Sequence, residues 1–138
     1  GCGWGPIATI MSLESPNATV WAVDVNSRAV DLTQRNAQAN GASGVRARKA
    51  EEALASSQES DTRFDVIWSN PPVRIGKEAM HEMLLAWLDR LAPAGVAYLV
   101  VQRNLGADSL ITWLSTQGYQ ASKYASKKGF RIIEVRPA

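Results

Sequence analysis

The sequence is poor in the residues that stabilise small secreted proteins and bind metal clusters. Its 138 residues contain one cysteine, Cys2, and one histidine, His81. A single cysteine forms neither an internal disulfide nor a cysteine metal cluster, so the composition fits a reducing, cytoplasmic setting. No run of residues is long and apolar enough to cross a bilayer. Disulfide scaffolds and helical membrane spans are thus excluded within these residues, and we expect no metal site.

Charge of one sign is not in large excess either. Lys and Arg number 15 and Asp and Glu number 13, which gives a net charge of +2 and an isoelectric point of about 8.9. This balance excludes a protein that coats nucleic acid, so RNA binding by this chain would be local. Apolar residues, in contrast, make up 46%, enough to form the core of the single domain that this length predicts.

Strand-like and helix-like segments alternate along the chain. Apolar runs predict strands at residues 19–25, 45–49, 64–69 and 96–102, and a terminal hairpin at 120–125 and 131–136. Amphipathic or capped segments predict helices at 6–14, at 28–40 behind an N-cap at Ser27, at 77–91 and at 108–116. Residues 50–62 predict a helical turn and then a loop, and residues 93–95 a turn. This alternation predicts a doubly wound, mostly parallel α/β sheet with a closing antiparallel hairpin.

A glycine-rich loop opens the chain. Gly1, Gly3 and Gly5 alternate with Cys2 and Trp4 before the first predicted helix. Glycine lets the backbone approach a ligand closely, and the amides at a helix start favour an anionic group. A dinucleotide fingerprint would need a further glycine at position 6, where this sequence has proline. The alternative is an ordinary tight turn between strand and helix.

Asp24 follows the apolar run from Val20 to Val23, at the carboxyl end of a predicted strand. Ligands of open α/β sheets bind beyond these strand ends, where a carboxylate accepts hydrogen bonds from a ribose diol. The alternative is that Asp24 caps the next helix, although Ser27 is better placed as the cap. Asp24 therefore indicates a nucleoside ligand without saying which one.

The run Ser69-Asn70-Pro71-Pro72 follows the strongest predicted strand. Consecutive prolines end a sheet and hold the backbone extended. The side-chain oxygen of Asn70 and the carbonyl of Pro71 then form a rigid pair of acceptors. Such a pair suits the two hydrogens of a substrate amino group and aims the nitrogen lone pair at an incoming methyl group. The alternative is a proline-terminated strand with an incidental asparagine.

In this order, the glycine loop, the second-strand acid and Asn-Pro-Pro resemble class I S-adenosylmethionine-dependent methyltransferases that act on amino groups. Three segments (SNPPVRIGK from Ser69, VVQRNLGADSL from Val100 and KGFRIIEV from Lys128) are similar to the "methyltransferase small" domain family. The resemblance covers nearly the whole chain. It implies a seven-stranded Rossmann-like sheet in the order 3-2-1-4-5-7-6, whose first strand precedes the glycine loop. We therefore expect residues 1–138 to be one catalytic domain that is incomplete at its N-terminus and poorly stable without that strand.

The resemblance also implies roles for individual residues. Asn70 and Pro71 would hold the target amino group, with Pro72 shaping the wall beside them. Asp24 would bind the ribose of S-adenosylmethionine, and Glu51 would stand in for an acid that meets the adenine. The remaining cofactor contacts would come from Gly1, Cys2, Gly3, Gly5, Val25, Asn26 and Asn70, and the substrate contacts from Val73, Arg74 and Lys77.

The best-known members of this family methylate guanine N2 of small-subunit ribosomal RNA, which is the substrate that we expect, as free RNA or in the assembling subunit. Adenine or a protein glutamine would fit the same pair of acceptors. A non-catalytic scaffold with an inherited fold is a further alternative. The lysines near residues 123–131 are either an RNA-facing edge or a charged hairpin that discourages edge pairing. We expect His81 to be a surface residue.

Overall fold

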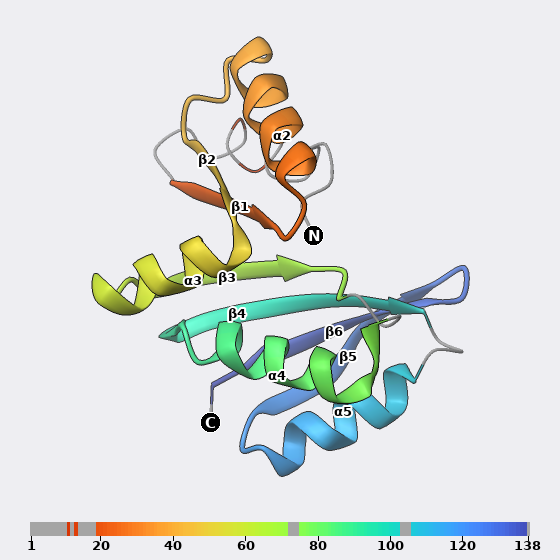
Figure 1. Ribbon diagram of the computed structural model, residues 1–138. Helices are drawn as coiled ribbons and strands as arrows, with labels where there is room; N and C mark the ends of the chain where they lie inside the picture. The colour runs from red at the N-terminus through yellow and green to blue at the C-terminus, as the bar shows by residue number, and fades with distance from the viewer. Residues whose placement is uncertain (1–10, 12, 14–18, 72–74, 103–105, 138) are drawn as a thin grey trace. The chain divides into compact units, whose positions relative to one another are not determined.

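The computed structural model describes residues 11, 13, 19–71, 75–102 and 106–137 (Figure 1). The chain divides into two compact units, one up to Glu59 and the other from Ser60 onward, and each is described by itself. Most of the helix predicted at residues 6–14 lies outside the described residues. None of the described helices combines the length and the apolar character that crossing a lipid bilayer requires.

The first unit contains two parallel strands and two helices. Strand β1 (Val20–Asp24) pairs in register with β2 (Val45–Lys49), and helices α2 (Ser27–Ala39) and α3 (Ala50–Glu59) follow the two strands in turn. The strands begin and end close to where the apolar runs predict. A small apolar cluster joins this sheet to α2 and consists of Val20, Ala22, Ala37, Ala42 and Val45.

Two local predictions in this unit were wrong. The N-cap of α2 is Asn26, whose side-chain oxygen accepts from the N–H groups of Arg28 and Ala29, so Ser27 is the first helical residue. The segment predicted as a turn and a loop forms the ten-residue helix α3. Glu51 and Glu52 lie in its first turn. They stabilise the helix because their negative charge is attracted to the partial positive charge at the helix N-terminus.

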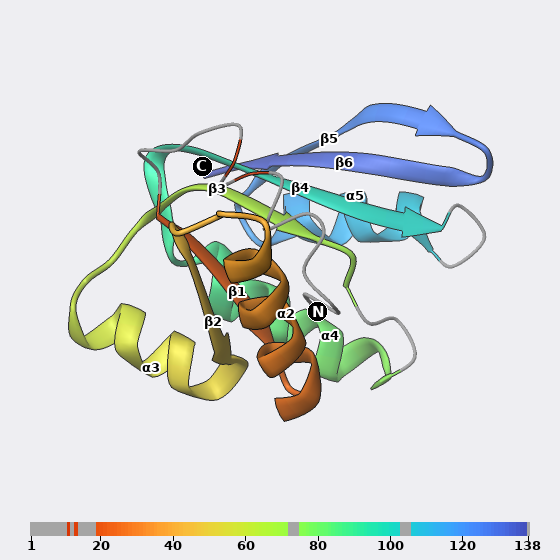
Figure 2. The ribbon, with the colours of Figure 1, turned by 90° about the horizontal axis from the view of Figure 1, so that it is seen from above.

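The second unit is a four-stranded sheet with two helices. Its elements are β3 (Phe64–Ser69), α4 (Lys77–Leu88), β4 (Leu91–Gln102), α5 (Ala107–Thr116), β5 (Gln120–Lys127) and β6 (Phe130–Arg136). The strands lie in the order β3-β4-β6-β5, where β3 and β4 are parallel and β6 is antiparallel to both β4 and β5 (Figure 2).

These pairings agree with the order that the resemblance implies. With its first strand left out, the order 3-2-1-4-5-7-6 divides into the pair β2-β1 and the run β3-β4-β6-β5, and both are observed. Among the described residues, no strand pairs with the second edge of β1 or with the outer edge of β3. The α/β fold class and the closing antiparallel hairpin are confirmed.

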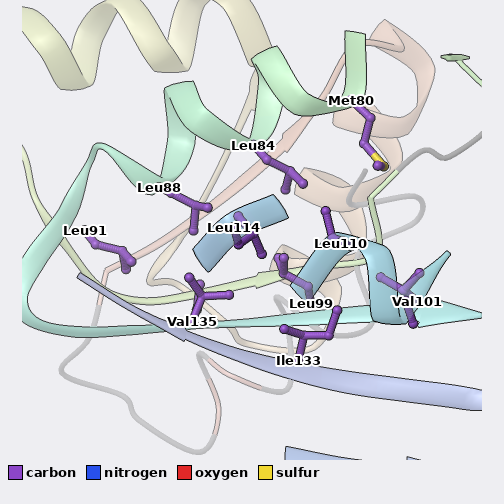
Figure 3. Packing of buried hydrophobic residues seen from close by; sticks show 12 residues of the cluster. Met80, Leu84, Leu88, Leu91, Leu99, Val101, Leu110, Leu114, Ile133 and Val135 are labelled. Carbon is purple, nitrogen blue, oxygen red and sulfur yellow. The ribbon is translucent and has the colours of Figure 1, made fainter. Parts of the chain in front are cut away.

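The core of the second unit lies between one face of the sheet and the two helices (Figure 3). Along β4, Ala97, Leu99 and Val101 are buried at alternate positions, as expected for a strand with one covered face. The helices contribute residues at spacings of three or four, and β6 adds two more, the set being Met80, Leu84, Leu88, Leu110, Leu114, Ile133 and Val135.

The boundary between α4 and β4 differs from the prediction. The helix ends at Leu88, and Leu91 already pairs with Phe64 as the first residue of β4, so the turn predicted at residues 93–95 is an irregularity inside the strand. Gly95 is required there because a Cβ atom would lie 2.8 Å from the carbonyl oxygen of Phe64. The proline and glycine of this segment therefore shape a bulge instead of ending a strand.

The hairpin prediction is confirmed and its turn is now defined. Lys127 pairs with Phe130, so Lys128 and Gly129 form a two-residue turn in which both residues have positive φ. Turns of this kind match the twist of the flanking strands. Tyr124 is inserted as a bulge between Lys123 and Ala125.

Candidate functional site

The candidate site residues of the first unit lie at the carboxyl edge of the β1–β2 sheet. Asp24 is the last residue of β1 and is half-buried. Its carboxylate accepts a hydrogen bond from the N–H of Asn26 at 3.0 Å, which holds the side chain at this edge. Because Asn26 caps α2, Asp24 does not serve as the helix cap, and this removes the main structural alternative to a role in ligand binding.

Val25 and Asn26 follow Asp24 and differ in what they offer a ligand. Val25 is 79% exposed, so its apolar side chain is available for contact with a flat, apolar ring. The side-chain oxygen of Asn26 already accepts two backbone N–H groups of α2. Asn26 therefore orients Asp24 and begins the helix, a role that sequence reasoning missed.

Glu51 lies at the same edge as Asp24. Asp24 pairs with Lys49 across the parallel strands, and Glu51 comes two residues later in the first turn of α3. Its side chain is exposed. The structure thus places Asp24 and Glu51, which are 27 positions apart in sequence, at one edge of the sheet.

The candidate site residues of the second unit lie at the carboxyl edge of the β3–β4 sheet. Asn70 follows β3 directly and is exposed, while Pro71 is buried. A buried Pro71 fixes the backbone on which the Asn70 side chain stands. Ser69 pairs with Leu99, which ties the start of this motif to the centre of the sheet.

Lys77 is the first residue of α4 and is exposed. Asn70 begins the β3–α4 connection, and Lys77 follows its end seven residues later. The other predicted site residues lie outside the described residues: Gly1, Cys2, Gly3, Gly5, Pro72, Val73 and Arg74.

Behind Lys77, a stacked pair of rings joins the two helices. The ring centroids of His81 on α4 and Trp113 on α5 are 3.5 Å apart, and the ring planes differ by 11°. The pKa of His81 is lowered by burial and, to a lesser extent, by the positive charge of Lys77 one turn earlier. His81 is thus a helix-packing residue that is neutral at physiological pH.

The face of the four-stranded sheet opposite α4 and α5 carries aromatic side chains that sequence reasoning did not single out. Trp68 on β3 lies 5.7 Å from Tyr98 on β4, and Tyr98 lies 5.2 Å from Tyr124 on β5, measured between ring centroids. Tyr124 and Phe130 are 61% and 40% exposed. The signal that could have found them is two aromatic residues within a hairpin rich in lysine.

The described residues therefore offer carboxylates and an exposed apolar side chain at one strand edge, and an amide on a rigid backbone at another. The first edge has the groups that bind a ribose and contact a flat ring, and the second has acceptors for the hydrogens of an amino group. Within the described ranges, no three side chains of His, Cys, Asp or Glu gather as a possible metal site.

The fold is that of S-adenosylmethionine-dependent methyltransferases. One similar structure is a SAM-dependent methyltransferase from Corynebacterium glutamicum, with a TM-score of 0.75, 18% identity and coverage of 100% of this chain and 77% of the other. Another is an rRNA methylase from Streptococcus thermophilus, with a TM-score of 0.70, 14% identity and coverage of 99% and 82%.

The sequence defines the family more narrowly. Residues 1–134 match the methyltransferase small domain, so the chain belongs to this family, as its motifs indicate. The uncharacterized protein YbxB of Bacillus subtilis is 34% identical over 99% of this chain and 67% of its own length.

Relatives with named activities fall into two groups. The release factor glutamine methyltransferase of Flavobacterium psychrophilum is 30% identical over 97% of this chain. The ribosomal RNA small subunit methyltransferase C of Cronobacter sakazakii is 36% identical over 59% of it. This chain spans 48% of the first relative and 22% of the second.

Proposed function

We propose that the chain transfers a methyl group from S-adenosylmethionine to an exocyclic amino nitrogen, and that its substrate is guanine N2 of small-subunit ribosomal RNA. The observation that carries this proposal is the position of Asn70-Pro71 directly after β3, with Asn70 exposed and Pro71 buried. The similarity to a ribosomal RNA small subunit methyltransferase supports the choice of substrate.

The chemistry needs orientation more than acid–base assistance. The cofactor, when bound, supplies a methyl group on a positively charged sulfur. The side-chain oxygen of Asn70 and the carbonyl of Pro71 accept the two hydrogens of the amino group and direct its lone pair at that methyl carbon. The amino nitrogen would take the methyl group from the sulfur, which would leave as a neutral thioether, and the nitrogen would then lose its extra proton to water. Such positioning contributes several kcal/mol to lowering the barrier.

The edge of β1 suits the nucleoside end of the cofactor. Asp24 would accept hydrogen bonds from the ribose hydroxyls, and the exposed side chain of Val25 would contact the adenine. Glu51, at the same edge, would meet the adenine amino group. The hydrogen bond from Asn26 to Asp24 supports this assignment because it holds the carboxylate in place.

A protein glutamine is the second candidate substrate. Its side-chain amide presents two hydrogens to the same acceptors. The similarity to a release factor glutamine methyltransferase extends over 97% of this chain, at 30% identity. RNA is preferred because the terminal hairpin, residues 120–136, has five basic residues and one acidic residue, as developed below.

The class of substrate can be tested with labelled S-adenosylmethionine. The chain is incubated with an extract from cells that lack the corresponding gene, and the products are treated with ribonuclease or with protease. We expect ribonuclease to release the label, whereas label that only protease releases would favour the glutamine candidate. An extract that takes up no label at all would favour a non-catalytic scaffold.

A further inference from the structure

The β5–β6 hairpin ends at the same edge of the sheet as Asn70. Ser69 pairs with Leu99 on β4, and three residues further along that strand Gln102 pairs with Phe130. The turn formed by Lys128 and Gly129 therefore lies beyond the carboxyl end of β4, on the side where Asn70 leaves β3. From ordinary strand spacing and rise, the Cα atoms of Asn70 and Phe130 are roughly 12 Å apart.

The hairpin concentrates the positive charge of the chain. Residues 120–136 contain five Lys or Arg and one acidic residue, Glu134, a net charge of +4. The whole chain has a net charge of +2, so the other 121 residues together have a net charge of −2. An anionic partner would therefore be drawn to the hairpin and not to the chain as a whole.

The cations of the hairpin differ in availability. Arg131 is 14% exposed and forms an ion pair with Asp108 on α5, so it stabilises the fold. Arg136 pairs with Glu134 in the same strand. Lys128 is exposed in the turn, and no described side chain forms an ion pair with it. Lys128 is thus the cation best placed to meet a ligand at this edge.

Phe130 adds a flat apolar surface beside Lys128. It pairs with Gln102 and therefore lies on the sheet face opposite α4 and α5, where it is 40% exposed. Tyr124 lies on the same face, 61% exposed and in edge contact with Tyr98. Proteins bind unpaired nucleotides with exposed aromatic rings and neighbouring cations, because every base can stack on a ring and every linkage carries a negative phosphate.

We propose that the hairpin tip, defined as Lys128, Gly129 and Phe130, binds the unpaired RNA strand next to the target nucleotide. Lys128 contacts a phosphate, and Phe130 stacks on a base beside the one held at Asn70. This inference rests on the proposed function and assigns the RNA-binding surface within it. A duplex target would have to open around the methylated base, as flipped-out bases do.

The test measures RNA binding by matched variants. The probe is a fluorescein-labelled single-stranded RNA of roughly ten nucleotides, followed by anisotropy at several salt concentrations. Lys128→Asn removes one charge, and asparagine tolerates the positive φ of the turn. Phe130→Leu keeps an apolar side chain but cannot stack, whereas Phe130→Tyr can. Arg35→Gln is the control, since it removes one charge from an exposed residue of α2.

The slope of log affinity against log salt is negative. We expect Lys128→Asn to reduce its magnitude by about 0.7, the value for one phosphate contact on a single strand. Phe130→Leu should weaken binding by roughly five- to 150-fold with an unchanged slope, and Phe130→Tyr should restore it. Arg35→Gln should bind like the wild type. Calorimetric titration with S-adenosylhomocysteine checks that each variant is folded.

Two results would overturn the hairpin assignment. If the wild type binds the RNA and all variants bind equally, another surface binds RNA, while the proposed function stands. If the wild type binds no RNA, the assignment fails, and the labelling experiment above decides the function separately. Label that enters RNA would then leave the proposed RNA methylation intact. Label that enters protein alone would contradict both the RNA substrate and the hairpin assignment.

Discussion

Asn70 is the residue on which the proposed chemistry depends most directly. We predict that Asn70→Ala lowers the rate of methyl transfer by at least about 100-fold, because the amino group loses one of its two acceptors and with it its orientation. Affinity for S-adenosylhomocysteine, measured by calorimetry, should change little. Asn70→Asp keeps an oxygen acceptor at the same place and should lose less activity. Equal loss of cofactor binding and of transfer would show that Asn70 has a general structural role.

A substitution at Asp24 tests cofactor binding separately from methyl transfer. Asp24→Asn removes the charge that strengthens hydrogen bonds to the ribose but keeps an oxygen for the N–H of Asn26. We predict that S-adenosylhomocysteine binds roughly ten- to 100-fold more weakly. Asp31→Asn is the matched control, because Asp31 is an exposed residue of α2 paired with Arg35. If both variants bind as the wild type does, Asp24 is not the ribose ligand.

At the residue scale, the sequence predicts where a residue lies in a strand better than it predicts which side chain makes a given hydrogen bond. Asp24 and Asn70 were assigned to strand ends because apolar runs mark where strands stop, and the structure agrees. The choice of Asn26 over Ser27 as the cap could not be made in advance, since both are good capping residues. The roles given to the glycine loop, to residues 72–74 and to the other site residues stay predictions.

The α4–β4 connection shows how one residue can control an element. Gly95→Ala would place a Cβ atom 2.8 Å from the carbonyl oxygen of Phe64 and 3.0 Å from that of Ala92. Backbone atoms cannot move aside cheaply, so we predict that the free energy of unfolding falls by about 1–3 kcal/mol, measured with urea. Ala94→Ser, at an exposed neighbour, should have little effect. An unchanged midpoint for Gly95→Ala would mean that the bulge is not tightly packed.

The contact between α4 and α5 predicts a dependence of stability on pH. Because the pKa of His81 is lowered in the folded state, the folded chain binds fewer protons than the unfolded chain near the ordinary histidine pKa of 6.5. The contribution of His81 to the free energy of unfolding is therefore fully present above about pH 6.5. It is lost as the pH decreases through the lower pKa of the folded state.

Urea unfolding at about pH 7.5 and about pH 5.5 measures this change, above the range where most carboxylates titrate. His81 is the only histidine, so His81→Gln should remove the difference between the two pH values. If His81→Gln keeps the full difference, another group is responsible.

At the element scale, strands with strong apolar runs could be predicted closely, whereas α3 and the start of β4 could not. Helix α3 buries only Ala53 and Ser57, so its sequence has little apolar periodicity, although Ala, Glu and Gln favour helices. Pro93-Ala94-Gly95 is typical of a turn, and only pairing with β3 shows that it lies within a strand. Both errors come from tertiary context, which local patterns do not contain.

At the scale of the whole molecule, periodicity alone predicts an α/β protein, and the resemblance adds the strand order. The order β3-β4-β6-β5 brings β6 between two strands that precede it in sequence, a crossing that no local pattern specifies. The same topology puts the hairpin tip and Asn70 at one edge, so the proposed RNA-binding surface forms only when the sheet is assembled. The single-domain expectation stays a prediction.

The central claim is methyl transfer to guanine N2, and analysis of the modified nucleoside tests it most directly. Small ribosomal subunits from cells that lack the gene are incubated with the chain and labelled S-adenosylmethionine, and their RNA is digested to nucleosides for mass spectrometry. We predict label in N2-methylguanosine with the wild-type chain and almost none with Asn70→Ala. Label in another nucleoside, or in methylglutamine when a release factor is supplied instead, would contradict this account.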